Sequence, residues 1–332
     1  MTHYVTTIKK ICGLVILTFF SLSPAFAENG DYGFTLSPNI GILYGHSEEI
    51  VYKESPNQNL YQSELLWDLK PLFYVGLGVD YRPQDPLMER GFIAALSFKS
   101  GLPLRTGIIE DSDWDNLEPN YYLTRYSRHD VYSKTAILLD ASAGYFWRFA
   151  GSLALSVYGE FSFMHFSWSG RDGYYQYAST NSEGLYLPWD SSLPKVYDVY
   201  NSLEVIRYMQ NWFILSPGVS LDWDMNRLFS MKAFFNYSPL IYCADRDDHF
   251  PDHFWHRTYF DYLYFGHYLK SGGELILSPS QNISLSLSAS YKRITGARGD
   301  TIYQSVRYKD EAGAGYSALD LGLAVKFRLK RD

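Results

Sequence analysis

The chain has 332 residues, with 29 lysines and arginines against 36 aspartates and glutamates, so its formal net charge is −7. Because a nucleic-acid partner requires a basic patch, this acidic balance excludes nucleic-acid binding. Tyrosine (30 residues), phenylalanine (21) and tryptophan (8) are abundant, whereas only two cysteines are present.

The first 27 residues are expected to form a secretory signal peptide. Lys9 and Lys10 precede an apolar run from Cys12 to Leu22, which is too short to span a bilayer as a helix. Ala25-Phe26-Ala27 then provides the small residues of a cleavage site. The mature chain would begin at Glu28 and keep Cys243 as its only cysteine, so no internal disulfide holds the fold together.

Ten segments alternate apolar and polar residues, as β-strands do. They lie near residues 31–46, 60–82, 91–111, 129–149, 152–178, 205–221, 228–245, 256–277, 282–297 and 313–327. Eight apolar residues in the second segment are odd-numbered, and we expect them to share one face: Leu65, Trp67, Leu69, Phe73, Val75, Leu77, Val79 and Tyr81. The opposite faces of these strands carry small or charged residues, including Asp68, Asp80, Lys99, Glu160 and Lys326. A polar lumen inside an apolar outer wall is typical of an outer-membrane barrel; a secreted β-sandwich or a periplasmic β protein is the alternative.

The connecting segments alternate between short and long. Short turns fall at 84–86, 150–151, 224–226 and 279–282, and longer polar loops near 47–59, 112–128, 179–204, 246–255 and 298–312. This pattern predicts an all-β fold: a ten-stranded antiparallel transmembrane β-barrel in one domain, residues 28–332. Several strands exceed the roughly 9–11 residues that cross a bilayer, so we expect them to project outside it. A barrel this narrow should be filled by side chains, which argues against an open porin.

Two acidic motifs end outward-running strands of this barrel, namely Asp111-Ser112-Asp113-Trp114 and Asp245-Arg246-Asp247-Asp248-His249. Residues two apart share a face of a strand, so each motif presents its acids on one side. In the third strand the odd residues, Asp111 and Asp113 among them, face inward if no bulge intervenes after Ser100. The alternation does not fix the phase of the seventh strand. A histidine opposite carboxylates at the outer rim can polarise a water molecule, which predicts hydrolysis.

At these residues the chain resembles the omptin family, outer-membrane endoproteases built on ten-stranded barrels. The two acidic motifs are the main anchors. Further matches are Leu43-x-Gly45 with Glu49 and Val51-Tyr52, Ser127-Arg128-His129, Phe166-Ser167 with Gly170 and Gly173, and Gly313-Ala314-Gly315.

The resemblance implies an aspartyl-type endopeptidase that needs no cofactor and acts on protein or peptide substrates from the extracellular side of the outer membrane. It implies that Asp111 and Asp113 are a catalytic pair, and that Asp247 and His249 are a dyad. Physical chemistry agrees: Asp247 can set the tautomer of His249, and two adjacent carboxylates raise one another's pKa. It also implies that Glu49 and Asp245 bind an Arg or Lys before the scissile bond.

Some residues depart from the family pattern. Arg125 stands where the family usually has an acid, and a cation there should disfavour a basic residue just after the cut. On the fifth strand and beside it, Phe161, Phe163, His165 and Asn211 replace the family's lipopolysaccharide-binding cluster of Tyr, Glu and basic residues. Contact with outer-membrane lipid is expected, and dependence on lipopolysaccharide is left open.

Two other functions are open. Long loops rich in tyrosine and tryptophan, with Trp189 and Tyr197 among them, would suit a non-proteolytic adhesin or binding barrel. Alternatively, His249, His253 and His256 with Asp247 and Asp252 could hold Zn²⁺. Their spacing does not place them on a metal-binding helix, so the solvated-loop interpretation is preferred and no metal is expected.

Overall fold

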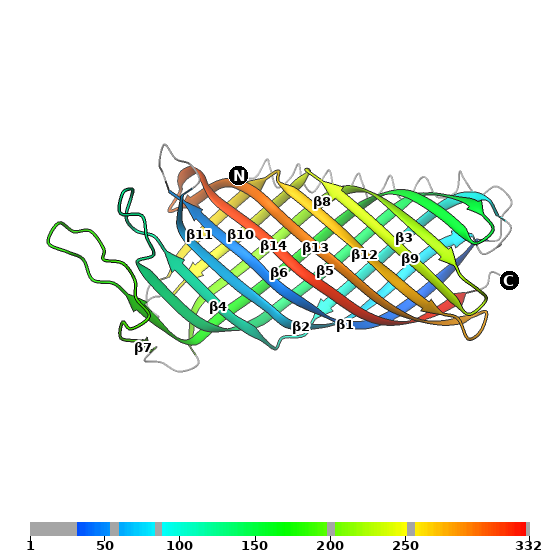
Figure 1. Cartoon of the computed structure of the whole chain (residues 1–332), viewed down its shortest axis with the longest axis horizontal. Helices are drawn as coiled ribbons and strands as arrows, with labels where there is room; N and C mark the ends of the chain where they lie inside the picture. Colours follow the sequence, from blue (N-terminus) through cyan, green and yellow to red (C-terminus); the bar gives the residue numbers. More distant parts are fainter. Residues whose placement is uncertain (1–31, 54–59, 84–87, 198–202, 251–255, 330–332) are drawn as a thin grey trace.

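The computed structural model describes residues 32–53, 60–83, 88–197, 203–250 and 256–329 (Figure 1). The proposed signal peptide, residues 1–27, lies outside these ranges. The strands in chain order are β1 (Tyr32–Tyr52), β2 (Tyr61–Pro83), β3 (Arg90–Gly101), β4 (Arg105–Asp113), β5 (Arg125–Ala150), β6 (Leu153–Tyr177), β7 (Val196–Tyr197), β8 (Glu204–Asp224), β9 (Phe229–Ser238), β10 (Ile241–His249), β11 (Arg257–Tyr264), β12 (His267–Leu277), β13 (Ile283–Tyr303) and β14 (Val306–Leu329).

These strands form a closed antiparallel barrel of ten wall strands, as the sequence predicted. β14 pairs with β1 and closes the ring. Three of the ten wall strands are interrupted, and each consists of two shorter strands. The first consists of β3 and β4, which both lie between β2 and β5. The other two lie side by side between β8 and β13, one made of β9 and β10 and the other of β11 and β12. The short strand β7 pairs only with the outer part of β6. Among the described residues, no helix is long and apolar enough to cross a membrane.

Strands β3, β9 and β12 lie in one half of the barrel (Figure 1), and this half carries the apolar outer wall. Its exposed side chains include Phe34, Ile40, Phe73, Val75, Leu77, Leu96, Phe98, Leu155, Val157, Leu215, Val219, Leu221, Phe229, Met231, Phe235, Leu275, Leu285, Leu287, Leu321 and Leu323. Such a belt faces lipid. The other half, with β4, β10 and β11, projects beyond it, as predicted for these long strands.

The projecting strands are longer than the sequence indicated. Residues 298–312, predicted as a long polar loop, are mostly strand, because β13 and β14 continue into a tight hairpin. Its turn residues Gln304 and Ser305 have φ values of 49° and 69°, as a two-residue hairpin turn requires. The prediction was wrong because a strand outside the bilayer needs no apolar outer face, so the alternation disappears while the pairing continues.

The alternation also changes phase where strands leave the membrane half. In β2, Trp67 and Leu69 are buried on the odd phase, yet Phe73 and Val75 on the same phase are exposed. The change coincides with a register shift in the β1–β2 pairing. The expected single apolar face from Leu65 to Tyr81 is therefore wrong.

The same change of phase explains why the predicted position of Asp68 in the lumen is wrong. It does not line the lumen but lies on the opposite face, where it forms an ion pair with Lys70 at 2.7 Å. The other predicted lumen residues, Asp80, Lys99, Glu160 and Lys326, do line the interior.

A layer of large side chains fills the barrel between its two halves. This layer, the aromatic floor, consists of Trp67, Phe166, Trp168, Tyr208 and Tyr316, each at most 1% exposed. The rings stack in series, with centroids 5.4 Å apart for Trp67–Tyr208 and 5.2 Å apart for Phe166–Trp168. Stacked aromatic rings pack densely and exclude water, so the interior is divided into an outer mouth and an inner cavity.

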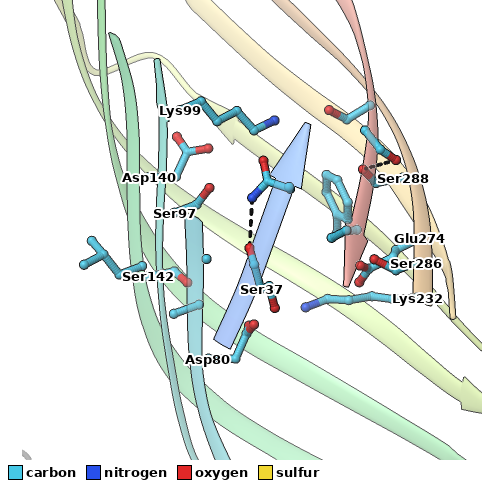
Figure 2. A pocket seen from close by; sticks show the side chains of 18 of the residues that line it. Ser37, Asp80, Ser97, Lys99, Asp140, Ser142, Lys232, Glu274, Ser286 and Ser288 are labelled. Carbon is cyan, nitrogen blue, oxygen red and sulfur yellow. Dashed lines mark hydrogen bonds between the residues drawn. The ribbon is translucent and has the colours of Figure 1, made fainter. Parts of the chain in front are cut away.

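The inner cavity, about 280 Å³, lies in the membrane half and is lined by serines and charged residues (Figure 2). Its charges are largely paired across the barrel: Lys270 reaches Glu160 at 2.8 Å, Lys292 reaches Asp140 at 3.2 Å, and Lys99 pairs with Asp320. Paired ions at this depth avoid the cost of isolated buried charge. The cavity is best explained as the hydrated, ion-paired core of the barrel.

Candidate active site

The first acidic motif lies on β4, at the outer end of the third wall. The strand is interrupted at residues 102–104, and its pairing with β5 shifts between Arg105 and Gly107. The assumption of an uninterrupted strand after Ser100 was therefore wrong. The predicted phase still holds, because Ile109 on the same face as Asp111 is only 1% exposed.

Serines from both neighbouring strands hold Asp111 in place. Ser63 Oγ on β2 donates to Asp111 Oδ1 at 3.3 Å, and Ser127 Oγ on β5 donates to Oδ2 at 3.4 Å. Burial raises the pKa of Asp111 to about 8, and the charge of Asp113 adds to the increase. Burial also raises the pKa of Asp113. The pair therefore holds a proton at neutral pH, as adjacent buried carboxyls do.

The second motif lies on β10, whose phase is set by the interruption at Pro239–Leu240. In β9 the odd residues Phe235 and Tyr237 are exposed, but in β10 Ile241 and Cys243 are buried. This change of phase turns Asp245, Asp247 and His249 toward the interior. An uninterrupted strand would have directed all three toward the outside.

Asp247 and His249 form a direct pair. His249 Nε2 is hydrogen-bonded to Asp247 Oδ2, and the two side chains are 39% and 4% exposed. Burial lowers the pKa of His249, but the charge and hydrogen bond of Asp247 outweigh it and raise the pKa to about 9. Because Nε2 faces Asp247, Nδ1 is the ring nitrogen free to accept another proton.

The two motifs interact across the mouth although β4 and β10 belong to different walls. The charges of Asp111 and Asp113 raise the pKa of His249, and His249 in turn lowers the pKa of Asp111. Figure 1 shows β4 and β10 at the same end of the barrel. The four predicted catalytic side chains thus share one electrostatic site above the aromatic floor.

The predicted substrate-binding acids lie beside this site and are deeply buried. Glu49 on β1 is 3% exposed and Asp245 on β10 is 4% exposed. Burial raises the pKa of both carboxyls well above the ordinary value, and neighbouring acids, Asp247 and Asp261 among them, reinforce this. Tyr208 Oη, from the aromatic floor, donates to Asp245 Oδ2 at 3.0 Å.

Asp261 on β11 is a further acid of this site that the sequence pattern did not indicate. It pairs directly with Asp245 across the β10–β11 ladder and is 4% exposed. Burial raises its pKa to about 6. Its only sequence signal is a single acid among aromatic residues in a predicted strand, and the cross-strand register that reveals its position cannot be read from that pattern.

Arg125 lies at the edge of the mouth, but its charge is already partnered. Its Nε contacts Asp115 Oδ2 at 2.9 Å, and Nη2 donates to Tyr186 Oη at 2.7 Å. The Tyr177 and Tyr186 rings also lie 5.4 and 4.7 Å from the guanidinium carbon. The predicted cation is therefore present as part of an ion pair.

The residues at the expected lipid contact are aromatic side chains and a histidine–asparagine pair. The Phe163 and Phe213 rings are 5.1 Å apart, and His165 Nδ1 lies 2.9 Å from Asn211 Oδ1. Elsewhere, no group of three or more His, Cys, Asp or Glu in the described ranges could hold a metal ion. Asp252 and His253 of the alternative zinc site lie outside those ranges.

Comparison with known proteins agrees with this architecture. The crystal structure of the outer membrane protease OmpT from Escherichia coli matches with a TM-score of 0.76 and 18% sequence identity, covering 92% of this chain and 98% of that chain. The translocator domain of the autotransporter NalP from Neisseria meningitidis matches with a TM-score of only 0.37 and 10% identity, covering 98% of each chain. No curated protein matches the sequence. The model of the Omptin family matches residues 31–329, and the chain therefore belongs to the omptin family.

Proposed function

We propose that this outer-membrane barrel is an endopeptidase in which a water molecule is activated between the Asp247–His249 dyad and the Asp111–Asp113 pair. The base is the neutral form of His249, which a pKa of about 9 makes the minority form at neutral pH. In this form His249 accepts a proton from the water through Nδ1 as the oxygen attacks the peptide carbonyl. Asp247 holds the ring and stabilises the imidazolium that forms. The protonated carboxyl of the Asp111–Asp113 pair then protonates the leaving amine. No side chain is acylated.

One arrangement carries this proposal: β4 and β10 bring the Asp111–Asp113 pair and the Asp247–His249 dyad to one end of the barrel (Figure 1), close enough for Asp111 and His249 to shift one another's pKa. Two acids and a histidine on distant strands have no structural need to share a buried site, since burying ionisable groups together costs stability. Ionisable groups with strongly shifted pKa values concentrate at functional sites. The location beyond the apolar belt supports cleavage on the extracellular side.

The same geometry supports a preference for Arg or Lys before the scissile bond. Glu49 and Asp245 are buried and acidic, and both lie within electrostatic reach of Asp247. A cationic side chain entering between them would relieve their mutual repulsion and gain charge-assisted hydrogen bonds.

The test uses the refolded barrel in lipid, with peptide libraries read by mass spectrometry. We expect cleavage after Arg or Lys, no inhibition by chelators or serine-directed reagents, and loss of activity in both Asp111→Asn and His249→Ala. Asp130→Asn removes an acid paired with Arg105 at 2.7 Å away from the site and should retain activity. Inhibition by chelators would contradict the water-activation mechanism and favour the metal alternative.

Samples with and without lipopolysaccharide should be compared, because the contact at His165 and Asn211 contains no lysine, arginine or glutamate side chain for charged groups of that lipid. We expect cleavage in both.

The alternative function, a binding barrel without protease activity, is favoured by one feature. Tyr177 and Tyr197 beside the mouth are 49% and 63% exposed. Absence of cleavage by folded protein across the library would support that alternative.

A further inference from the structure

Asp261 is an additional acid of the mouth that the mechanism above does not use. It lies on β11 directly opposite Asp245 on β10, and both side chains are 4% exposed. Directly opposed residues of an antiparallel pair have neighbouring side chains, and like charges placed there repel. Burial raises the pKa of both acids and a hydrogen bond joins them, so a shared proton limits this repulsion in the empty pocket, and a bound cation can take the place of that proton.

The missing partner can be inferred from oxygen atoms that have no hydrogen bond. Glu49 Oε2, Asp245 Oδ1 and Asp261 Oδ1 are all buried without a donor. In the described part of the chain, no ion pair with a lysine or arginine reaches these three side chains. Unpaired buried acceptors cost free energy, and three together form a site for a ligand with several N–H donors.

The chemistry of the site favours a guanidinium over a metal ion or an ammonium. No metal-holding group of side chains is present among the described residues. A guanidinium carries five N–H donors in a planar fork, whereas an ammonium is a compact charge with three. The acceptors lie on three different strands, β1, β10 and β11, and a planar fork is better suited than an ammonium to several acceptors at once.

We propose that Asp261 is a specificity-determining residue that, together with Asp245 and Glu49, binds the guanidinium of the residue before the scissile bond and selects arginine over lysine. This inference rests on the proposed endopeptidase function. It narrows the proposed preference from arginine or lysine to arginine, and assigns a role to an acid that neither acidic motif contains.

The pocket should also respond to pH. The charged groups around Asp261 are Asp245 and Asp247 on β10, Glu49 on β1 and Glu311 on β14, while Thr301 on β13 donates a hydrogen bond to it. With burial raising its pKa to about 6, Asp261 is neutral in more acidic solution and attracts a cation less. The preference for arginine should therefore weaken as the pH falls through about 6.

The experiment compares three peptides that differ only before the scissile bond, with arginine, lysine or the uncharged isostere citrulline. The enzymes are the unaltered barrel, Asp261→Asn and the control Asp130→Asn. We expect Asp261→Asn to reduce kcat/KM for the arginine peptide by about 10- to 100-fold, as loss of a hydrogen bond to a charged group does. The lysine peptide should lose less and the citrulline peptide should change by under about twofold. The control should behave like the unaltered barrel.

A binding measurement separates this inference from the proposed cleavage. Fluorescence anisotropy in the Asp111→Asn background reports peptide binding without turnover. Tighter binding of the arginine peptide than of the citrulline peptide, abolished by adding Asp261→Asn, supports the inference whether or not the unaltered barrel cleaves. An unchanged arginine preference in Asp261→Asn overturns it. If that variant does not fold, Asp261→Ser provides the same comparison.

Discussion

The dyad on β10 leads to a sharp prediction for Asp247→Asn. Asp247 is 4% exposed and its Oδ2 is bonded to His249. Burial lowers the pKa of His249 from its ordinary value of 6.5, and Asp247 is the main group that raises it to about 9. With a neutral amide in its place, only Asp111 and Asp113 oppose the effect of burial. We expect the pKa of His249 to fall to about 6.5 or below.

The rate should fall although more of the imidazole is unprotonated at neutral pH. The amide can present either its oxygen or its NH₂ to Nε2, so the tautomer with a free Nδ1 is no longer enforced. Loss of the orienting acid in a comparable base–acid pair reduces kcat by about 10⁴-fold. We expect a reduction of about 10³- to 10⁴-fold here, which corresponds to about 4–5 kcal/mol of transition-state stabilisation.

The assay is kcat/KM for an arginine peptide between pH 5 and 10, together with NMR titration of labelled histidine. Asp248→Asn is the matched control, because Asp248 is on the same strand but bonded to Arg246 and Thr258; its activity should stay within about twofold. Retention of full activity by Asp247→Asn, or an unshifted acidic limb of its profile, would refute the proposed role of the dyad.

Three further predictions concern the surroundings of the site. In Asp113→Asn the charge that reinforces the effect of burial on Asp111 is gone, so the pKa of Asp111 should fall below about 8; the alkaline limb of the pH profile should move to lower pH, and an unmoved limb would contradict the coupling. Arg125→Ala leaves Asp115 without its 2.9 Å partner, so the kcat/KM ratio for peptides with lysine rather than glutamate after the cut should rise several-fold, and a constant ratio would exclude Arg125 from the substrate path. Trp168→Ala removes a fully buried ring and should reduce the free energy of unfolding by about 3–5 kcal/mol; a loss below about 1 kcal/mol in denaturant titrations would mean that the floor is loosely packed.

The membrane half of the fold could be predicted from the sequence because every second residue of a strand faces lipid there and must be apolar. Exposed residues such as Leu96, Phe98, Leu285 and Leu287 are apolar, and alternation therefore identified their strands. In the projecting half the outer face of the wall does not meet lipid, so no such rule applies to that face. That is why the β13–β14 hairpin was interpreted as a loop.

The acidic motifs could be found, but their orientation could not be fully derived. Asp111 has the predicted phase even though its strand is interrupted. For His249 the orientation depends on the interruption at Pro239–Leu240, which reverses the faces between β9 and β10. Asp261 depends on a similar change at Phe265–Gly266, where both residues have positive φ, 61° and 127°. The alternation of apolar residues does not indicate where the backbone makes such a change, so the orientation of these side chains could not be predicted.

The changes of phase and the aromatic floor have one combined consequence. In the membrane half the strands direct apolar residues outward to lipid, and in the outer half they direct bulky residues such as Trp67 and Ile241 inward. Burial is the largest cause of the raised pKa values of Asp111 and Asp261, and no charge of the inner cavity is among the main groups that shift them. The proposed reactivity of the mouth therefore depends on the changes of phase between the membrane half and the outer half, because these changes turn the acids inward.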